Sequence, residues 1–555
     1  MKVWPSKPNP PKILFVTLVL LGGIVASCHP MLFSGLQLIQ TDLGDTRLNN
    51  YILEHSYRWL VGNALHRQFW SQPIFFPSIH TTAYGDILLG AAPLYWLLRA
   101  WGTAPDTAFQ FWIMAALALN FLTAFLVFRS GLRFNTLASA AGAYLFAFAG
   151  IRVAQFGHQQ LFLQFFSMLA IYALCRLYRD FTADNGSSGS VVFWTVILGA
   201  MVVLQLYTSI YLGWFLSFGL LVFLTVAAWR RETRPTLLRF IREYRWLLSS
   251  VAVAVLLSLS WLGYYYSLTY REFGGRQWLE VHNMVPRLLS WFNLGNRSWL
   301  YGWTWDLLPL AHIPMEHEHR LGLGLLTLGL ALVGLVRLSR TPWGRVLAIT
   351  TIFIFLLALV YPGGWTPWRA VYTLVPGANA IRGVARISLL LLIGFSFGLA
   401  YFFTGLKSKG LALVLLSLVF LEQWQTIPAY DKYAVRTKVA AIARLIPRDC
   451  QAFYYVNLDF DQRGGVDFHQ LDAMWAGLAS EVPTMNGYHG WFPHDWGFCN
   501  LIRSQISHPA ELSKVKTHLQ FWLKRHNLPD QLRLVTQDQH GVYLLSGRHR
   551  PQPPP

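Results

Sequence analysis

The feature that most constrains this chain is a series of apolar stretches, each long enough to cross a bilayer as a helix. A transmembrane helix needs roughly 17 to 25 predominantly apolar residues. Eleven such stretches lie near residues 13–33, 107–128, 135–151, 160–177, 191–207, 209–229, 246–266, 321–338, 345–361, 384–404 and 410–427. Only 13% of the 555 residues are charged, about half the roughly 25% of an average soluble protein. The sequence therefore predicts a mainly α, polytopic membrane protein with about 11 transmembrane helices.

The positive charge of the chain lies mostly in short loops between these stretches. A net charge of +19 would suggest a nucleic-acid partner in a soluble protein, but basic loops in a membrane protein mark the cytoplasmic side. These loops are at 129–133, 176–179, 230–245, 337–345 and 407–409. We therefore expect no nucleic-acid partner and a cytoplasmic N-terminus. The opposite, outer face then receives residues 34–106, 152–159, 267–320, 362–383 and everything after about 428.

One further apolar stretch, Tyr84 to Trp101, does not fit this alternation. If it crossed the membrane, every later basic loop would lie outside. Asp86, Pro93 and Arg99 make it suitable for a re-entrant or interfacial helix on the outer face. The alternative is that it spans and that another stretch has been miscounted.

The composition changes after residue 427, where charges of both signs and turn residues appear. We predict a transmembrane domain over 1–427, with the first outer loop at 34–106, and a small α/β domain over 428–555 on the outer face. Within that domain, residues 454–458 and 532–536 are expected to be strands and 510–525 a helix. Cys450 and Cys499 could form a disulfide on an oxidising face.

Two carboxylates stand just after the first apolar stretch, in the segment Thr41-Asp42-Leu43-Gly44-Asp45-Thr46. Asp42 and Asp45 are three residues apart, are separated by a glycine and precede an amphipathic helix. Carboxylates at such a place can serve as general bases or metal ligands. The alternative is that Asp45 only caps the helix that starts at Thr46.

The Asp-x-x-Asp-Thr motif, the segment Trp70 to Pro77, Tyr84-Gly85-Asp86 and the segment Asn379 to Arg386 together carry a resemblance. With the single first span, the long outer loop and the C-terminal outer domain, they resemble the GT-C superfold of membrane glycosyltransferases, in a largely uncharacterised bacterial branch. The resemblance implies a polyprenyl-phosphate-linked sugar donor, a lipid, glycan or protein acceptor, and a location in the bacterial inner (cytoplasmic) membrane. It also implies a catalytic carboxylate in the first outer loop, which is Asp45 and, with less support, Asp42; Asp86 joins the candidate substrate-binding residues.

The departing lipid phosphate would need positive charge near the outer surface. Arg382 and Arg386 are spaced i, i+4 at the start of the stretch 384–404, so they are expected on one face of a helix. Arginine matches phosphate oxygens two at a time. Snorkelling to lipid headgroups is the alternative. Arg152 and His158, in a short outer loop, could assist phosphate binding or could be structural.

The loop 267–320 ends in a dense run of histidine and glutamate that includes His312, Glu316, His317, Glu318 and His319. The composition makes a divalent metal possible, but no spacing matches a helical ligand pair. Glu316 and Glu318 could instead contact the sugar or its phosphate, or the segment could be a solvated loop.

The segment 482–493 of the C-terminal domain contains Asn486-Gly487-Tyr488-His489. Asn-Gly favours a turn with positive φ, and Tyr488 and His489 would offer a polar aromatic surface to an acceptor sugar. A purely structural turn is the alternative. No nucleotide-binding loop occurs, which favours a lipid-linked donor. The main hypothesis is a hexosyl- or pentosyl-transferring enzyme; a lipid or glycolipid transporter and a non-catalytic scaffold are the alternatives.

Overall fold

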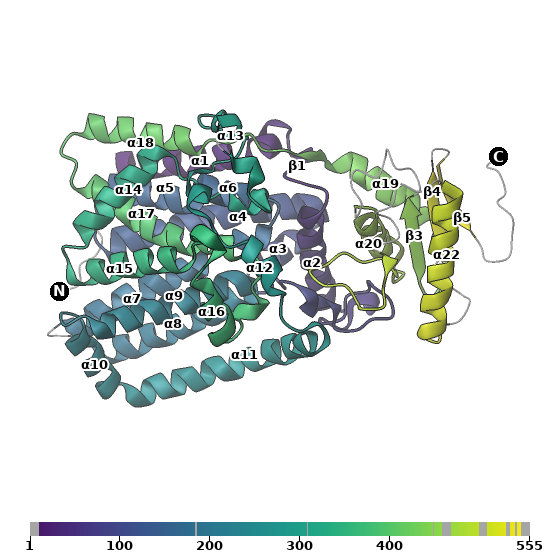
Figure 1. The fold of residues 1–555 in the computed structure, drawn as a ribbon, viewed down its shortest axis with the longest axis horizontal. Coiled ribbons are helices and arrows are strands. Elements are labelled where there is room, and N and C mark those ends of the chain that lie inside the picture. Colours follow the sequence, from purple (N-terminus) through teal and green to yellow (C-terminus); the bar gives the residue numbers. More distant parts are fainter. Residues whose placement is uncertain are drawn as a thin grey trace. The chain divides into compact units, whose positions relative to one another are not determined.

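The chain folds into two compact units, seen in a computed structural model (Figure 1). The structure describes residues 10–183, 186–307, 309–447, 449–457, 468–498, 508–528, 533–538 and 541–545. The first unit comprises residues 1–33, 111–262 and 274–427, and the second comprises 34–110, 263–273 and 428–555. The predicted boundary near 427 is thus one of several, and the first long loop belongs to the same unit as the C-terminal region.

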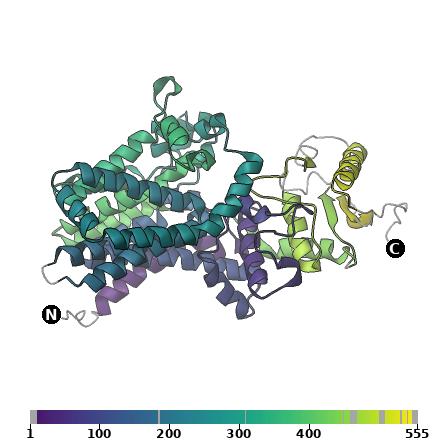
Figure 2. The same ribbon diagram turned by 90° about the horizontal axis from the view of Figure 1, so that it is seen from below.

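The first unit is a helical bundle. Its elements are α1 (Pro10–Phe33), the greater part of α4 (Pro105–Leu126), α5 (Thr136–Phe148), α6 (Gly150–Ala154), α7 (Phe165–Thr182), α8 (Ser188–Thr208), α9 (Ile210–Trp229), α10 (Arg234–Glu243), most of α11 (Arg245–Phe273), α12 (Trp278–Asn283), α13 (Thr304–Leu307), α14 (Leu325–Leu338), α15 (Pro342–Leu357), α16 (Trp368–Leu374), α17 (Ser388–Thr404) and α18 (Lys409–Gln423). Figure 2 shows α11, in teal, along the outside of this bundle.

The apolar stretches of the sequence form helices, as predicted. Among the described residues, eight helices are long and apolar enough to cross a membrane, and each coincides with one predicted span. The other three predicted spans correspond to the shorter helices α14, α15 and α18, which have 14, 16 and 15 residues. The fold class is therefore confirmed: the protein is mainly α and crosses a membrane several times.

The centre of the bundle is α17, which packs closely against α14 and α5. A Cβ atom on Gly398 would lie 2.2 Å from the carbonyl oxygen of Ala331, and one on Gly334 would lie 1.8 Å from that of Gly398. On the other side, a Cβ atom on Gly142 would lie 3.0 Å from the carbonyl oxygen of Ser396. Small residues at helix crossings let backbones approach, which is how helices associate in lipid.

The stretch Tyr84–Trp101 does not form a spanning helix. It consists of the end of a 3-10 turn, Thr81–Tyr84, a loop, and the nine-residue helix α3 (Ala92–Ala100). Nine residues at 1.5 Å each reach roughly 13 Å, less than half of a hydrocarbon core of about 30 Å. Asp86 was expected at the start of this helix and lies instead in the loop before it, because the helix begins only at Ala92.

The second unit combines helices with two small sheets. Its elements are β1 (Leu38–Ile39), α2 (Asp45–Leu60), α3, β2 (Tyr430–Asp431), α19 (Lys432–Arg444), β3 (Phe453–Asn457), α20 (Phe468–Ser480), α22 (His508–Arg525), β4 (Arg533–Asp538) and β5 (Gly541–Leu545). β1 pairs antiparallel with β2, which joins the first long loop to the C-terminal region. In the larger sheet, of order β3-β4-β5, β3 and β4 are parallel and β4 and β5 antiparallel.

The elements predicted for the C-terminal region are present with small shifts in their ends. β3, β4 and α22 correspond to the expected strands 454–458 and 532–536 and the expected helix 510–525. Their core is formed by buried apolar side chains of α19, β3, α20 and β4, among them Ile442, Phe453, Ala473 and Val535. Cys499 lies outside the described residues, so its pairing with Cys450 stays a prediction.

Candidate functional site

Asp45 occupies the first position of α2, where its carboxylate accepts a hydrogen bond from a distant tyrosine. The hydroxyl of Tyr488 donates to Oδ1 of Asp45 at 2.8 Å. Asp45 is half-buried, and the positive end of the α2 dipole favours a carboxylate in this first turn. The structure therefore brings together two of the residues that the sequence singled out, although 443 positions separate them.

Asp45 does not cap α2, which corrects the structural alternative. The cap residue is Gly44, and no side chain makes a cap hydrogen bond. Asp42 instead folds back on its own loop: Oδ1 accepts from the Gly44 backbone N–H at 2.8 Å and Oδ2 accepts from the Thr41 hydroxyl at 2.9 Å. Asp42 thus shapes the loop, and the Asp45 side chain is directed to Tyr488.

Tyr488 and His489 are positioned by Asn486, which is locked into the sheet. The Asn486 side chain accepts from the Tyr455 N–H at 2.7 Å and donates to the Tyr455 carbonyl at 2.8 Å. The turn with positive φ predicted for Asn486-Gly487 is wrong, because neither residue has a positive φ. Gly487 is needed for close approach: a Cβ atom there would lie 2.2 Å from the Phe75 ring.

His489 is buried beside the Asp45–Tyr488 pair and packs on a glycine. A Cβ atom on Gly85 would lie 2.6 Å from Cε1 of His489. The Gly490 backbone N–H donates to Nδ1 at 3.0 Å. Burial lowers the pKa of His489 to about 4, against the opposing effect of a hydrogen bond to the Tyr84 backbone and of the Asp45 charge. The imidazole is therefore neutral at physiological pH.

Asp86 follows the same glycine and is half-exposed. The Gly85 carbonyl accepts a hydrogen bond from the Tyr266 hydroxyl at 2.5 Å, and the Tyr84 hydroxyl donates to Glu272 at 3.4 Å. These contacts fix the backbone on both sides of Gly85. Of the candidates in the second unit, Asp45, Tyr488 and His489 form one group, and Asp86 borders the glycine that His489 packs against.

In the first unit, Arg386 forms a buried ion pair with Glu318. Nη2 of Arg386 lies 2.6 Å from Oε1 of Glu318, and Nε donates to Oε2 at 3.1 Å. Both side chains are about 4% exposed or less. Burial alone would raise the pKa of Glu318, but Arg386 and His158, whose Nε2 lies 3.9 Å away, hold that pKa well below its usual range. Arg386 also lies over the ring of Tyr211.

Arg382 and Arg386 do not share a helix face, which corrects the sequence-based interpretation. Arg386 lies in the 3-10 turn Val384–Ile387, and Arg382 precedes that turn in a segment without regular secondary structure. Arg382 is 37% exposed, and its Nη1 lies 3.3 Å from Oε1 of Glu280. Arg276 approaches the same Glu280 oxygen at 4.0 Å. Two arginines therefore share one carboxylate, so a surplus positive charge remains.

Sequence reasoning did not select Arg276, Glu280 or Tyr211. The Tyr211 hydroxyl accepts backbone N–H groups from Arg382 at 3.1 Å and from Gly383 at 3.3 Å, which fixes the segment before the 3-10 turn. Tyr211 and Glu280 lie 171 and 102 positions from Arg382. The one signal in the sequence that pointed to this group was the pair Arg271 and Arg276, which lies outside the predicted cytoplasmic loops.

Arg152 is fully buried and supports the chain around it. Its guanidinium donates to the carbonyl oxygens of Phe146 and Leu161 at 3.1 Å, and to that of Phe162 at 3.3 Å. A further N–H donates to Oε1 of Gln164 at 2.7 Å. These contacts occupy most of the N–H groups of the guanidinium, so few remain for a ligand. We therefore assign Arg152 to holding the loop and not to binding phosphate.

Side chains of the histidine–glutamate run are also occupied by contacts with other residues of the chain. Glu316 accepts from Arg320 at 3.0 Å and from Asn293 at 2.8 Å. His319 is buried and contacts the Ser290 hydroxyl at 2.9 Å. In the part of the chain that the structure describes, no group of three or more histidine, cysteine, aspartate or glutamate side chains could hold a metal ion.

The arrangement of the helices matches solved structures. The archaeal oligosaccharyltransferase AglB from Archaeoglobus fulgidus, in complex with an inhibitory peptide and a dolichol-phosphate, has a TM-score of 0.51 and 10% sequence identity over 95% of this chain and 69% of that chain. The Archaeoglobus fulgidus oligosaccharyltransferase in the apo form has a TM-score of 0.52 and 11% identity over 94% of this chain and 69% of that chain. The chain has the GT-C fold.

No protein-family model and no curated protein matches the chain. The GT-C fold is therefore established by the course of the backbone, and 10% identity transfers no side chain. Because one fold can carry many activities, the function of this chain depends on its own side chains and not on the fold alone.

Proposed function

We propose that the protein transfers a sugar from a polyprenyl-phosphate-linked donor to a lipid, glycan or protein acceptor. The single observation that carries this proposal is the Asp45 carboxylate, half-buried at the start of α2 and hydrogen-bonded by Tyr488, in a chain with the GT-C fold. The dolichol-phosphate and peptide belong to the structure of AglB; their chemistry agrees with a lipid-phosphate donor and a polymeric acceptor.

Asp45 is the proposed catalytic base. An acceptor hydroxyl forms a bond to the anomeric carbon of the sugar, the bond from that carbon to the phosphate oxygen breaks, and the proton passes to the Asp45 carboxylate. The Tyr488 hydroxyl holds the carboxylate in one rotamer, which is what a general base needs in order to reach its proton. Since a tyrosine hydroxyl is a neutral donor, it orients Asp45 without neutralising its charge, as an arginine would.

Arg382 is the proposed donor-phosphate ligand. It shares Glu280 with Arg276 and is partly exposed, so a planar guanidinium and a surplus charge are available to phosphate oxygens. Arg386 is already paired bidentately with Glu318, and His158 lies at the edge of that pair. We assign Arg386, Glu318 and His158 to positioning the segment that carries Arg382, and Glu316 to holding Arg320.

The basic loops favour a cytoplasmic N-terminus and support a reaction on the outer face of the membrane. A bacterial inner membrane and a hexosyl or pentosyl donor remain part of this proposal.

The proposal is tested by replacing Asp45 with Asn in cells. Asparagine keeps the size of the side chain and removes the base. The surface glycan and glycolipid profile of the variant should match that of a full deletion, with the variant expressed and folded at wild-type level. Glu481→Gln, an exposed carboxylate in the same unit, is the matched control and should give the wild-type profile. A wild-type profile for Asp45→Asn, beside a clear deletion phenotype, would show that the protein acts as a scaffold or by another residue.

A further inference from the structure

A small cavity in the second unit lies among positively charged side chains. It measures about 150 Å³. It is lined by Ile39, Arg47, Asn50, Pro105, Asp106, Tyr430, Lys432, Val435, Arg436, Val439 and Trp475. The walls therefore come from β1, from α2, from the start of α4, from β2 and α19, and from α20. None of these residues takes part in the chemistry assigned above.

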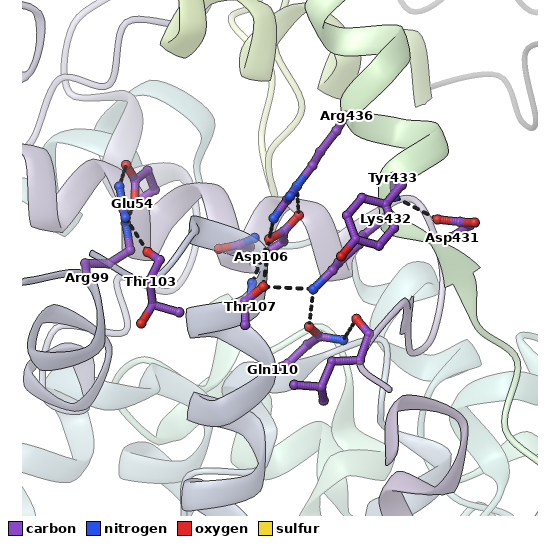
Figure 3. Close-up of polar contacts among 12 residues, drawn as sticks. Glu54, Arg99, Thr103, Asp106, Thr107, Gln110, Asp431, Lys432, Tyr433 and Arg436 are labelled. Carbon is purple, nitrogen blue, oxygen red and sulfur yellow. Dashed lines mark hydrogen bonds and ion pairs between the residues drawn. The ribbon is translucent and has the colours of Figure 1, made fainter. Parts of the chain in front are cut away.

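Lys432 is buried without direct contact to a carboxylate among the described residues. It is 4% exposed, and its ammonium donates to the Thr107 hydroxyl at 2.8 Å and to Oε1 of Gln110 at 3.0 Å. Figure 3 shows the ammonium held between these two neutral acceptors. The neighbouring carboxylate, Asp106, is occupied by Arg436, whose Nε lies 2.6 Å from Oδ2. A buried charge left in this way is unfavourable unless a ligand compensates it.

Arg47 supplies a second cation to the cavity. It is 4% exposed, and its Nη1 lies 2.8 Å from Oδ1 of Asp472. Lys438 lies 2.8 Å from the other oxygen of the same carboxylate, so two cations share Asp472. Three cationic side chains, Arg47, Lys432 and Arg436, line the cavity, and Asp106 is the one carboxylate in its lining.

Two buried donors on the cavity lining have no acceptor in the described parts of the chain. They are Nη2 of Arg47 and Nε1 of Trp475. A buried donor left unsatisfied costs about 1–3 kcal/mol, so the pair marks a place where an acceptor-rich group fits. Glu54 in the same unit, also drawn in Figure 3, differs in this respect. Its two carboxylate oxygens accept hydrogen bonds from Arg58, Arg99 and Tyr95.

We propose that this cavity binds the carboxylate or phosphate group of an acidic sugar. The surplus positive charge and the two free donors select an oxyanion, since charge-assisted hydrogen bonds to oxyanions are the strong ones. Trp475 and the aliphatic side chains Ile39, Val435 and Val439 form apolar walls that suit the C–H face of a sugar ring. The choice of a sugar as carrier rests on the proposed function, whereas the oxyanion site itself does not.

The test is calorimetric binding to the full-length protein purified in detergent. The probes are glucuronate, glucose 6-phosphate, inorganic phosphate and, as the neutral control, glucose. We expect at least one of the two acidic sugars to bind at least tenfold more tightly than glucose, and whichever binds identifies the carboxylate or the phosphate as the natural group. Equal binding of glucose and both acidic sugars would overturn the site. Inorganic phosphate binding as tightly as glucose 6-phosphate would overturn the sugar as carrier.

Variants separate this site from the catalytic proposal. Lys432→Met should weaken binding of the acidic sugar at least tenfold, whereas Lys514→Met, which removes an exposed charge from α22, should leave it unchanged. If Lys432→Met does not fold, Arg436→Gln, at a 42% exposed side chain, takes its place with the same expectation. Wild-type binding by the cavity variant would contradict the proposal. Asp45→Asn should bind the sugar normally while failing to transfer, so binding and catalysis can fail independently.

Discussion

Glu318 in the first unit and Asp45 in the second are both carboxylates that the sequence analysis selected, yet their hydrogen-bond partners are of opposite kinds. Glu318 is buried and bound at both oxygens by the guanidinium of Arg386. Asp45 is half-buried and receives the hydroxyl of Tyr488. Opposite charge compensates the first, and a neutral donor orients the second.

The partner of a carboxylate decides whether it can act as a general base. A buried carboxylate that is fully paired with arginine is held as an anion with a lowered pKa, so it is a poor proton acceptor and a strong structural tie. A carboxylate held by a neutral hydroxyl keeps its charge, its orientation and part of its access to solvent.

The largest effect is expected from Glu318→Gln. The variant leaves Arg386 buried without its counter-charge, and breaking a buried pair in this way typically costs about 3–5 kcal/mol. Thermal unfolding in detergent should show a clearly lowered Tm. Glu316→Gln, on the same 3-10 turn but at a less buried ion pair, should lower the Tm much less. Equal effects of the two variants would mean that the Arg386–Glu318 pair is no special tie.

A pH effect of about 3 kcal/mol is expected from His489. Its pKa is lowered to about 4 from an ordinary 6.5, first by burial, so the unfolded chain binds the proton more readily. The stability that the neutral imidazole maintains is present above pH 6.5 and is lost as the pH falls from 6.5 towards 4; at 1.36 kcal/mol per pKa unit this gives the stated size.

The measurement is the Tm of the wild type and of His489→Gln across this pH range, because other buried histidines such as His55 titrate in the same direction. The variant should lose less stability on acidification than the wild type. His494→Gln, at an exposed position, is the control and should follow the wild-type curve. Parallel curves for wild type and His489→Gln would contradict the assignment.

Tyr488→Phe should lower the transfer rate by roughly thirtyfold, from about 2 kcal/mol for a hydrogen bond to a charged group. The phenyl ring keeps the packing, so the Tm should change little. Tyr433→Phe, at a 53% exposed tyrosine in the same unit, is the matched control. An unchanged rate in Tyr488→Phe would remove the tyrosine from the orientation of Asp45.

The smallest effect is expected from Arg382→Ala, because this arginine is partly exposed and solvent screens its charge. Binding of a polyprenyl-phosphate analogue should weaken by about fivefold, equivalent to about 1 kcal/mol, without loss of Tm. Arg382→Lys should recover part of the affinity, since it keeps the charge and loses the planar fork. Unchanged affinity in Arg382→Ala would favour contact with lipid headgroups instead.

Most helices could be predicted from the sequence because length and hydrophobicity largely decide whether a segment spans. For Tyr84–Trp101 the charges of the later loops were needed as well. The Arg382–Arg386 spacing misled for a local reason: it was interpreted as helical, but Arg382 lies before the 3-10 turn, and its backbone N–H is held by the Tyr211 hydroxyl. That contact spans 171 positions, and nothing in a single sequence indicates it.

Several residues of the candidate site could be predicted from the sequence, but the contacts between them could not. Asp45 and Tyr488 were each selected from short motifs, yet their hydrogen bond crosses 443 positions. Arg152 was selected as a cation in a loop, and its burial against carbonyl oxygens, which decides its role, depends on packing. The compact unit that combines residues 34–110 with 428–555 likewise depends on long-range pairing such as β1 with β2.

The most direct test of the central claim compares sugar transfer by purified Asp45→Asn and Asp42→Asn. If Asp45 is the base, its variant should lose transfer by roughly 10²–10⁴-fold, the usual contribution of general base catalysis, with an unchanged Tm. Asp42→Asn, which perturbs only the loop around Gly44, should retain transfer within about tenfold, equivalent to 1.4 kcal/mol. Comparable losses in both variants, or a larger loss in Asp42→Asn, would contradict the account.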